Sequence, residues 1–113
     1  MIGRKDDSVN VVLSPLATWA LSVASWLFVR EGYTCTITSA HDGDTHADNS
    51  KHYAARQPGG GVDPNSADAF DLRTRQMPPA NKRAIGEELA AALGTDFDVI
   101  LEDTHLHVEY DPR

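Results

Sequence analysis

Two histidines near the end of the chain, His105 and His107, alternate with apolar residues and are followed by Glu109. In an extended strand, side chains alternate between two faces, so both imidazoles and the carboxylate are predicted to share one face. His52 and Asp71, earlier in the chain, add one more group of each type. Catalytic zinc sites use three such protein ligands and leave one position for water. The residue types therefore permit a zinc site, although an ordinary solvated sheet face is the alternative interpretation of the strand.

The composition of the chain limits the kinds of metal site, the number of domains and the class of partner. The chain has 113 residues and a single cysteine, Cys35, which excludes an intrachain disulfide and any multi-cysteine zinc or iron–sulfur site. A chain of this length supports one hydrophobic core, so residues 1–113 are predicted to form a single domain. The formal net charge of −7 disfavours a nucleic-acid partner, because a phosphate backbone is held mainly by basic surface.

The N-terminal part is predicted to contain a packed helix. No charged residue occurs from Ser8 to Val29, Ser14-Pro15 is a helix start, and Arg30-Glu31-Gly32 is a stop. About 15 helical residues span about 23 Å, less than the roughly 30 Å of a bilayer core, which disfavours a membrane anchor and with it a signal-anchored lysin. The face expected to pack against the domain comprises Leu16, Trp19, Ala20, Val23 and Leu27.

Alternation and turn residues indicate strands in the rest of the chain, with one more helix. The strand Tyr33–Ser39 is expected to bury Tyr33, Ile37 and Cys35, the last as an inert thiol. Residues 41–68 are rich in Gly, Asp, Asn and Pro and are interpreted as one long loop. The other predicted elements are a strand at Ala69–Arg73, a helix at Asn81–Leu93 ended by Gly94, and strands Asp98–Glu102 and His105–Tyr110 joined by a tight turn. The expected fold class is α+β, a small antiparallel sheet with flanking helices.

Three short blocks carry a resemblance to a known family: Ser50-Lys51-His52-Tyr53, Ala69–Arg73 and Glu102–His107. They resemble the signature blocks of the zinc D-alanyl-D-alanine carboxypeptidases and L-alanyl-D-glutamate endopeptidases. That superfamily shares its fold with the hedgehog signalling domain and includes many bacteriophage endolysins. The resemblance extends from about Leu13 to Tyr110 and is greatest to small phage and prophage peptidases.

The resemblance implies a hydrolase with one Zn²⁺ per chain, held by His52, Asp71 and His107. It assigns His105 to the substrate carbonyl or its oxyanion. The family's general base is a carboxylate just before the last ligand, for which Glu102 is the first candidate and Asp103 the second. The implied reaction is hydrolysis of a peptide bond in the peptidoglycan stem, by carboxypeptidase or endolysin-type endopeptidase action. Zinc lowers the pKa of bound water towards 7, and a nearby carboxylate accepts the proton.

Substrate contacts are expected from three residues. Arg73 suits a two-pronged bond to a substrate carboxylate, although a surface arginine is the equal alternative. Ser50 belongs to the first signature block. A stretch like the one containing His46 recurs in the phage relatives, although a merely solvated His46 is the equal alternative. His41 is expected to be solvated, yet His41 with Asp48 forms a rival to the preferred His52/Asp71 pairing.

Two departures from the family pattern motivate a second functional hypothesis. Residues 53–70 separate His52 from Asp71, which implies an insertion around Gln57–Asn65, and Thr104 stands where several members carry the catalytic carboxylate. The alternative is a catalytically degenerate domain that binds zinc or the cell wall, for example as a component of a phage particle. No signal peptide is recognisable and the localisation stays open, so a cell-wall role implies delivery by another route, such as a phage holin or a virion, with other virion or lysis proteins as possible partners.

Overall fold

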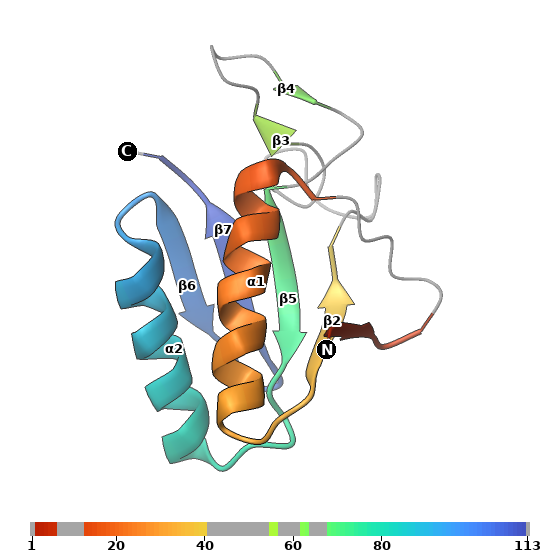
Figure 1. Ribbon diagram of the computed structural model, residues 1–113, viewed down its shortest axis with the longest axis vertical. Helices are drawn as coiled ribbons and strands as arrows, with labels where there is room; N and C mark the ends of the chain where they lie inside the picture. Colours follow the sequence, from red (N-terminus) through yellow and green to blue (C-terminus); the bar gives the residue numbers. More distant parts are fainter. Residues whose placement is uncertain (1, 7–12, 41–54, 57–61, 64–67, 113) are drawn as a thin grey trace.

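One five-stranded sheet and two helices make up the body of the chain (Figure 1). The computed structural model describes residues 2–6, 13–40, 55–56, 62–63 and 68–112. The elements in chain order are β1 (Ile2–Arg4), α1 (Pro15–Arg30), β2 (Cys35–Ser39), β3 (Ala55–Arg56), β4 (Val62–Asp63), β5 (Ala69–Arg73), α2 (Pro79–Leu93), β6 (Phe97–Leu101) and β7 (His105–Tyr110).

The strands of the main sheet are arranged in the order β1-β2-β5-β7-β6. All neighbouring pairs are antiparallel except β1 and β2, which run parallel. The α+β class is therefore confirmed, but the expectation of a purely antiparallel sheet was wrong. The difference comes from β1, whose three residues are too few to show a period-two pattern in the sequence.

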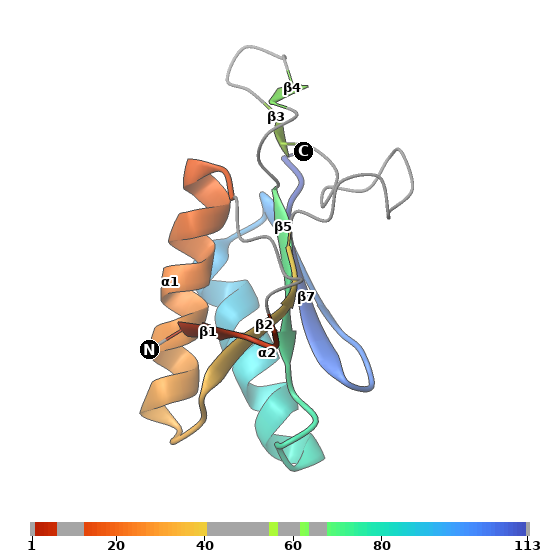
Figure 2. The same ribbon diagram turned by 90° about the vertical axis from the view of Figure 1, so that its right-hand side faces the viewer.

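Both helices lie on the same face of the sheet (Figure 2). Strand residues that point to this face are buried against α1 and α2 and form the core with them. The main strand contributors are Ile37, Phe70, Leu72, Leu106 and Val108. Because side chains alternate along a strand, their neighbours in β5 and β7 must project from the opposite face, which no described helix covers.

Helix α1 has the predicted ends, although its buried face differs from the prediction. Ser14 caps the helix, its hydroxyl accepting a hydrogen bond from the Ala17 amide at 3.2 Å. Leu16 and Trp19 are 44% and 46% exposed, so their assignment to the packed face was wrong. Three alanines lie on the true buried face and let the helix approach the sheet closely. That face comprises Ala17, Ala20, Leu21, Ala24, Leu27 and Phe28.

No helix in the described ranges is long and apolar enough to cross a membrane.

The C-terminal half follows the predicted order closely. Helix α2 begins at Pro79, two residues before the predicted start, because proline is well tolerated in a first turn. Gly94 ends it with a φ of 84°, a left-handed conformation that glycine adopts without strain. Strand β6 starts and ends one residue earlier than predicted, so Glu102 belongs to the turn and its amide donates to the His105 carbonyl at 2.9 Å.

The structure around β2 differs from the prediction in two further ways. Strand β2 starts at Cys35, and Tyr33 lies before it and is only half-buried. Cys35 is fully buried as predicted, and burial raises the pKa of its thiol to about 12, which makes it unreactive at neutral pH. Strands β3 and β4 form a short antiparallel ladder, so residues 41–68 are not entirely loop. Two-residue strands are too short to leave a periodic signal in the sequence.

Candidate functional site

The register of β5 and β7 brings the predicted site residues together. Asp71 lies directly opposite His107, and Arg73 lies opposite His105. Asp71 is flanked by Phe70 and Leu72, which are both buried in the core on the helix side. The strand alternation therefore directs Asp71 to the uncovered face, where it lies close to both imidazoles.

Asp71, His107 and Glu109 form a hydrogen-bonded chain across this face. Asp71 Oδ1 lies 2.7 Å from His107 Nδ1, and Glu109 Oε1 lies 3.2 Å from His107 Nε2. The side chains of Asp71 and His107 are only 15% and 16% exposed. Carboxylate oxygens accept hydrogen bonds, so this arrangement favours the imidazolium form of His107, in which both ring nitrogens donate.

The surroundings of His107 favour its protonated form. Burial disfavours the charged ring, but hydrogen bonds and charge from Asp71, followed by those from Glu109, outweigh burial and raise the pKa of His107 above its ordinary 6.5. The imidazolium form is therefore favoured by folding, and the ring must lose a proton before a metal can bind.

This raised pKa predicts a pH dependence for the metal-free protein. A histidine whose pKa is higher in the folded state stabilises the fold fully below its unfolded pKa of about 6.5, and that contribution is lost as the pH rises through the folded pKa. We expect the melting temperature of the wild type, relative to that of His107→Gln, to fall as the pH is raised from mildly acidic to alkaline. A difference that stays constant or grows with pH would contradict the assignment.

His105 lies between Asp71 and Glu102. Its Nε2 atom is 3.1 Å from Glu102 Oε2 and 3.8 Å from Asp71 Oδ2, while its Nδ1 atom is 3.3 Å from the Thr104 hydroxyl. Glu102 is half-exposed, so its carboxylate faces both the imidazole and solvent. A carboxylate, an imidazole and a buried aspartate in contact can take up, hold and release protons.

Asp103 and Arg73 occupy different places relative to this group. The Asp103 side chain is exposed, and its backbone carbonyl accepts a hydrogen bond from Lys82 Nζ at 3.0 Å. In the described part of the chain, no contact links the Asp103 carboxylate to His105 or His107. Of the two candidates for the general base, Glu102 is therefore the one that contacts a histidine. Arg73 lines a hollow of about 400 Å³ near the start of β2. The other residues around the hollow are Gly32, Tyr33, Thr34, Thr36 and Gln76.

Several predicted residues lie outside the described ranges. These are His52, the preferred first zinc ligand; Ser50 and His46, the predicted substrate contacts; and the rival pair His41 and Asp48. Their roles stay predictions from the sequence.

Two of the three predicted zinc ligands, Asp71 and His107, can be tested for fit. A tetrahedral zinc with bonds of about 2.1 Å holds its ligand atoms about 3.4 Å apart. Asp71 Oδ1 and His107 Nδ1 are 2.7 Å apart. If the two atoms moved apart by about 0.7 Å, a zinc ion could bind between them in place of the hydrogen-bonding proton. A carboxylate oxygen and an imidazole nitrogen are also suitable zinc donors, so the two residues fit this metal.

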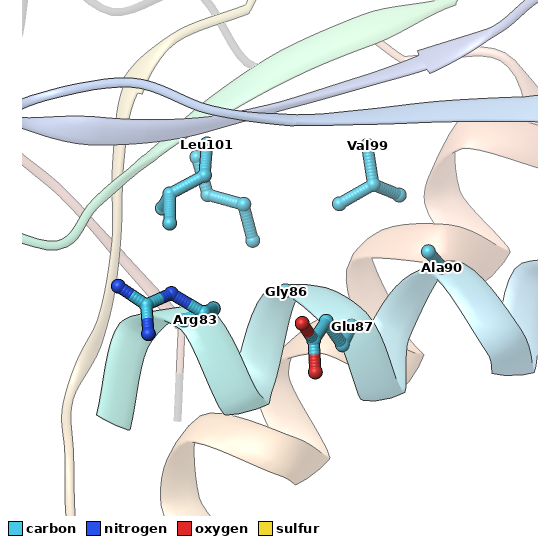
Figure 3. A pocket seen from close by; sticks show the side chains of 7 residues that line it. Arg83, Gly86, Glu87, Ala90, Val99 and Leu101 are labelled. Carbon is cyan, nitrogen blue, oxygen red and sulfur yellow. The ribbon is translucent and has the colours of Figure 1, made fainter. Parts of the chain in front are cut away.

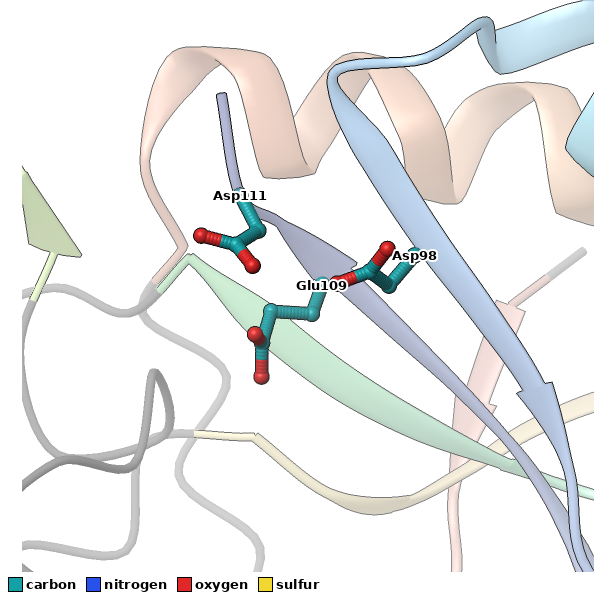
Figure 4. A group of neighbouring side chains, drawn as sticks. All are labelled: Asp98, Glu109 and Asp111. Carbon is teal, nitrogen blue, oxygen red and sulfur yellow. The ribbon is translucent and has the colours of Figure 1, made fainter. Parts of the chain in front are cut away.

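A separate acidic group lies beside the site, formed by Asp98, Glu109 and Asp111 (Figure 4). It is the only set of three potential ligand residues in the described ranges whose donor atoms all lie within 4.8 Å of one another. Its donors are all oxygens, a set that suits Ca²⁺ or Mg²⁺ better than zinc. Strand alternation places Glu109 on the imidazole face, but its contact with His107 could not be predicted from the sequence. Its pairing with Asp98 was also not predicted, because it depends on the β6–β7 register.

A pocket of about 170 Å³ lies between α2 and the sheet (Figure 3). Val99, Leu101 and Leu106 form its sheet side, and Arg83 and Glu87 of α2 border it. Leu106 precedes His107 in β7 and therefore points to the opposite face. This pocket is thus separated from the histidines by the sheet and is not part of the candidate site.

Comparisons with protein-family models, with curated proteins and with solved structures found no significant match to this chain. The peptidase resemblance therefore rests on the three sequence blocks.

Proposed function

We propose that this protein is a zinc-dependent peptidase of the hedgehog/DD-peptidase type, which hydrolyses a peptide bond in the peptidoglycan stem. The proposal is supported above all by the 2.7 Å approach of Asp71 to His107 on the sheet face without helices, with His105 and Glu102 in contact beside them. Such a set of carboxylates and imidazoles, half-buried on one face, is suited to both metal binding and proton transfer.

Each residue has a proposed role. Asp71, His107 and the sequence-predicted His52 would hold the zinc, which when bound would supply Lewis acidity at the scissile carbonyl. Glu102 would accept the proton of the attacking water and pass it to the leaving amine. His105, held at 3.1 Å by Glu102, would donate a hydrogen bond to the carbonyl oxygen as negative charge develops there.

Arg73 would bind the substrate. In the described part of the chain, no ion pair occupies its guanidinium, and it borders the hollow near the start of β2. Its position two residues along β5 from Asp71 places it on the same sheet face as Asp71 and His107. A substrate carboxylate bound there would lie close to the reacting bond, as hydrolysis near a free chain end requires.

Metal analysis tests the proposal directly. We expect elemental mass spectrometry to find one zinc per wild-type chain, and we expect the zinc-loaded protein to cleave stem peptides in a reaction stopped by chelation and restored by zinc. His52→Ala should lose the metal, whereas the matched variant His41→Ala should keep it. Zinc-free wild type after reconstitution would contradict the proposal, and loss only in His41→Ala would transfer the ligand role to the rival pair.

One observation favours a second candidate function, metal or cell-wall binding without hydrolysis. Thr104 stands where the resemblance expects a catalytic carboxylate, and its hydroxyl contacts His105 instead. In that case the wild type would bind zinc or intact cell walls but would cleave no stem peptide of any wall type.

A further inference from the structure

Glu109 contacts the ring nitrogen of His107 that faces away from Asp71. Its Oε1 atom lies 3.2 Å from His107 Nε2, while Asp71 lies 2.7 Å from Nδ1 on the other side of the ring. The Glu109 side chain is only 22% exposed. The two carboxylates thus hold the imidazole from opposite edges, and together they set which nitrogen faces Asp71.

The Glu109 carboxylate lies among two other carboxylates and the His107 ring. Its backbone lies in the middle of the sheet, opposite Ala69 on one side and Asp98 on the other. The Asp98 and Asp111 carboxylates approach within 4.8 Å, and like charges so close repel one another (Figure 4). The Glu109 carboxylate also contacts the His107 ring, whose N–H can donate to it and offset part of this repulsion.

We propose that Glu109 is a positioning residue, which holds the Nε2–H of His107 and thereby directs Nδ1 to the metal position beside Asp71. This inference rests on the proposed function and extends it to a residue that the family resemblance did not assign. A carboxylate that accepts a hydrogen bond from the distal nitrogen of a ligating histidine fixes the orientation of the ring and raises its basicity. Loss of such a partner typically weakens metal binding about 10- to 100-fold.

The test compares variants of Glu109 with a matched variant of Asp98. Zinc dissociation constants are measured by competition with a chromophoric chelator for wild type, Glu109→Ala, Glu109→Gln and Asp98→Asn. The visible absorption of the Co²⁺-substituted proteins reports ligand geometry, and melting of the metal-free proteins reports the fold. Asp98→Asn removes an equal charge from the same acidic group without removing the acceptor of the Nε2–H.

We expect Glu109→Ala to bind zinc about 10- to 100-fold more weakly, with an altered Co²⁺ spectrum. Glu109→Gln, which keeps an acceptor oxygen, should recover part of the affinity, and Asp98→Asn should bind as tightly as the wild type. Tight binding by Glu109→Ala, or equal weakening by Asp98→Asn, would overturn the role of Glu109 while leaving the zinc site intact. Absence of zinc from the wild type would instead refute the proposed function, and this inference with it.

Discussion

Replacing His107 by alanine is expected to remove the zinc and abolish hydrolysis, whereas replacing His105 by alanine is expected to leave the zinc in place. His107 Nδ1 faces Asp71 at 2.7 Å and is a proposed ligand atom, whereas His105 Nε2 is 3.8 Å from Asp71 and contacts Glu102 instead. His105→Ala should therefore lower the rate about 10²- to 10³-fold, the usual cost of losing one donor to the developing oxyanion. Elemental analysis and stem-peptide hydrolysis, measured on the same preparations, separate the two effects.

The His107 and His105 variants need a control that shows whether each protein still folds. Removing the His107 ring leaves the buried Asp71 carboxylate without the imidazole, at a cost of about 1–3 kcal/mol in the free energy of unfolding. His107→Gln retains polar atoms near Asp71 and serves as a second variant if the alanine variant unfolds. If a folded His107→Gln or His107→Ala protein kept a full equivalent of zinc, the proposed ligand set would be wrong.

The parts of the fold that could be predicted are those with a strong local signal. The residues of Ala69–Arg73 and the alternation in His105–Tyr110 predicted both strands, and the alternation in the second also gave the face of each of its side chains. Helix α1 could be delimited because Ser14-Pro15 and Arg30–Gly32 supply physical start and stop signals. Strand β1 has three residues and pairs with β2 in parallel, so only tertiary contact stabilises it.

The buried face of α1 was mispredicted because the largest apolar residues of the helix are not the ones that lie closest to the core. Trp19 and Leu16 are large and apolar yet about half-exposed, whereas the alanines of the opposite face are fully buried. Trp19 remains at the margin, where its ring lies 5.8 Å from that of Phe97. Close packing of a helix on a sheet depends on shape, which a hydrophobic periodicity does not report.

The sheet face that the two histidines share could be predicted from the sequence, but the contacts between the side chains on that face could not. The alternation placed His105, His107 and Glu109 on one face, and the sequence blocks added Asp71 and Glu102. The contact between His107 and Glu109 requires particular side-chain rotamers, and the approach of Asp98 to Glu109 requires the β6–β7 register. Neither is encoded in the spacing of residues along the chain.

Replacing Glu102 by glutamine is expected to lower hydrolysis about 10²- to 10⁴-fold, the usual contribution of a general base, while the zinc content stays at one per chain. Glutamine keeps the size of the side chain and an acceptor oxygen for the His105 Nε2–H, but it cannot accept the proton of the attacking water. The measurement is the rate of stem-peptide cleavage against pH, with metal content determined on each sample.

Asp103→Asn is the matched variant, because it makes the same chemical change one residue further along the turn. Asp103 is exposed, and among the described residues no contact links its carboxylate to His105 or His107, so its removal should leave the rate nearly unchanged. A large loss in Asp103→Asn with an active Glu102→Gln would move the base to Asp103 and would require the turn between β6 and β7 to rearrange on substrate binding. If neither variant lost activity, the base would have to come from another residue, and the proton path through Glu102 would be wrong.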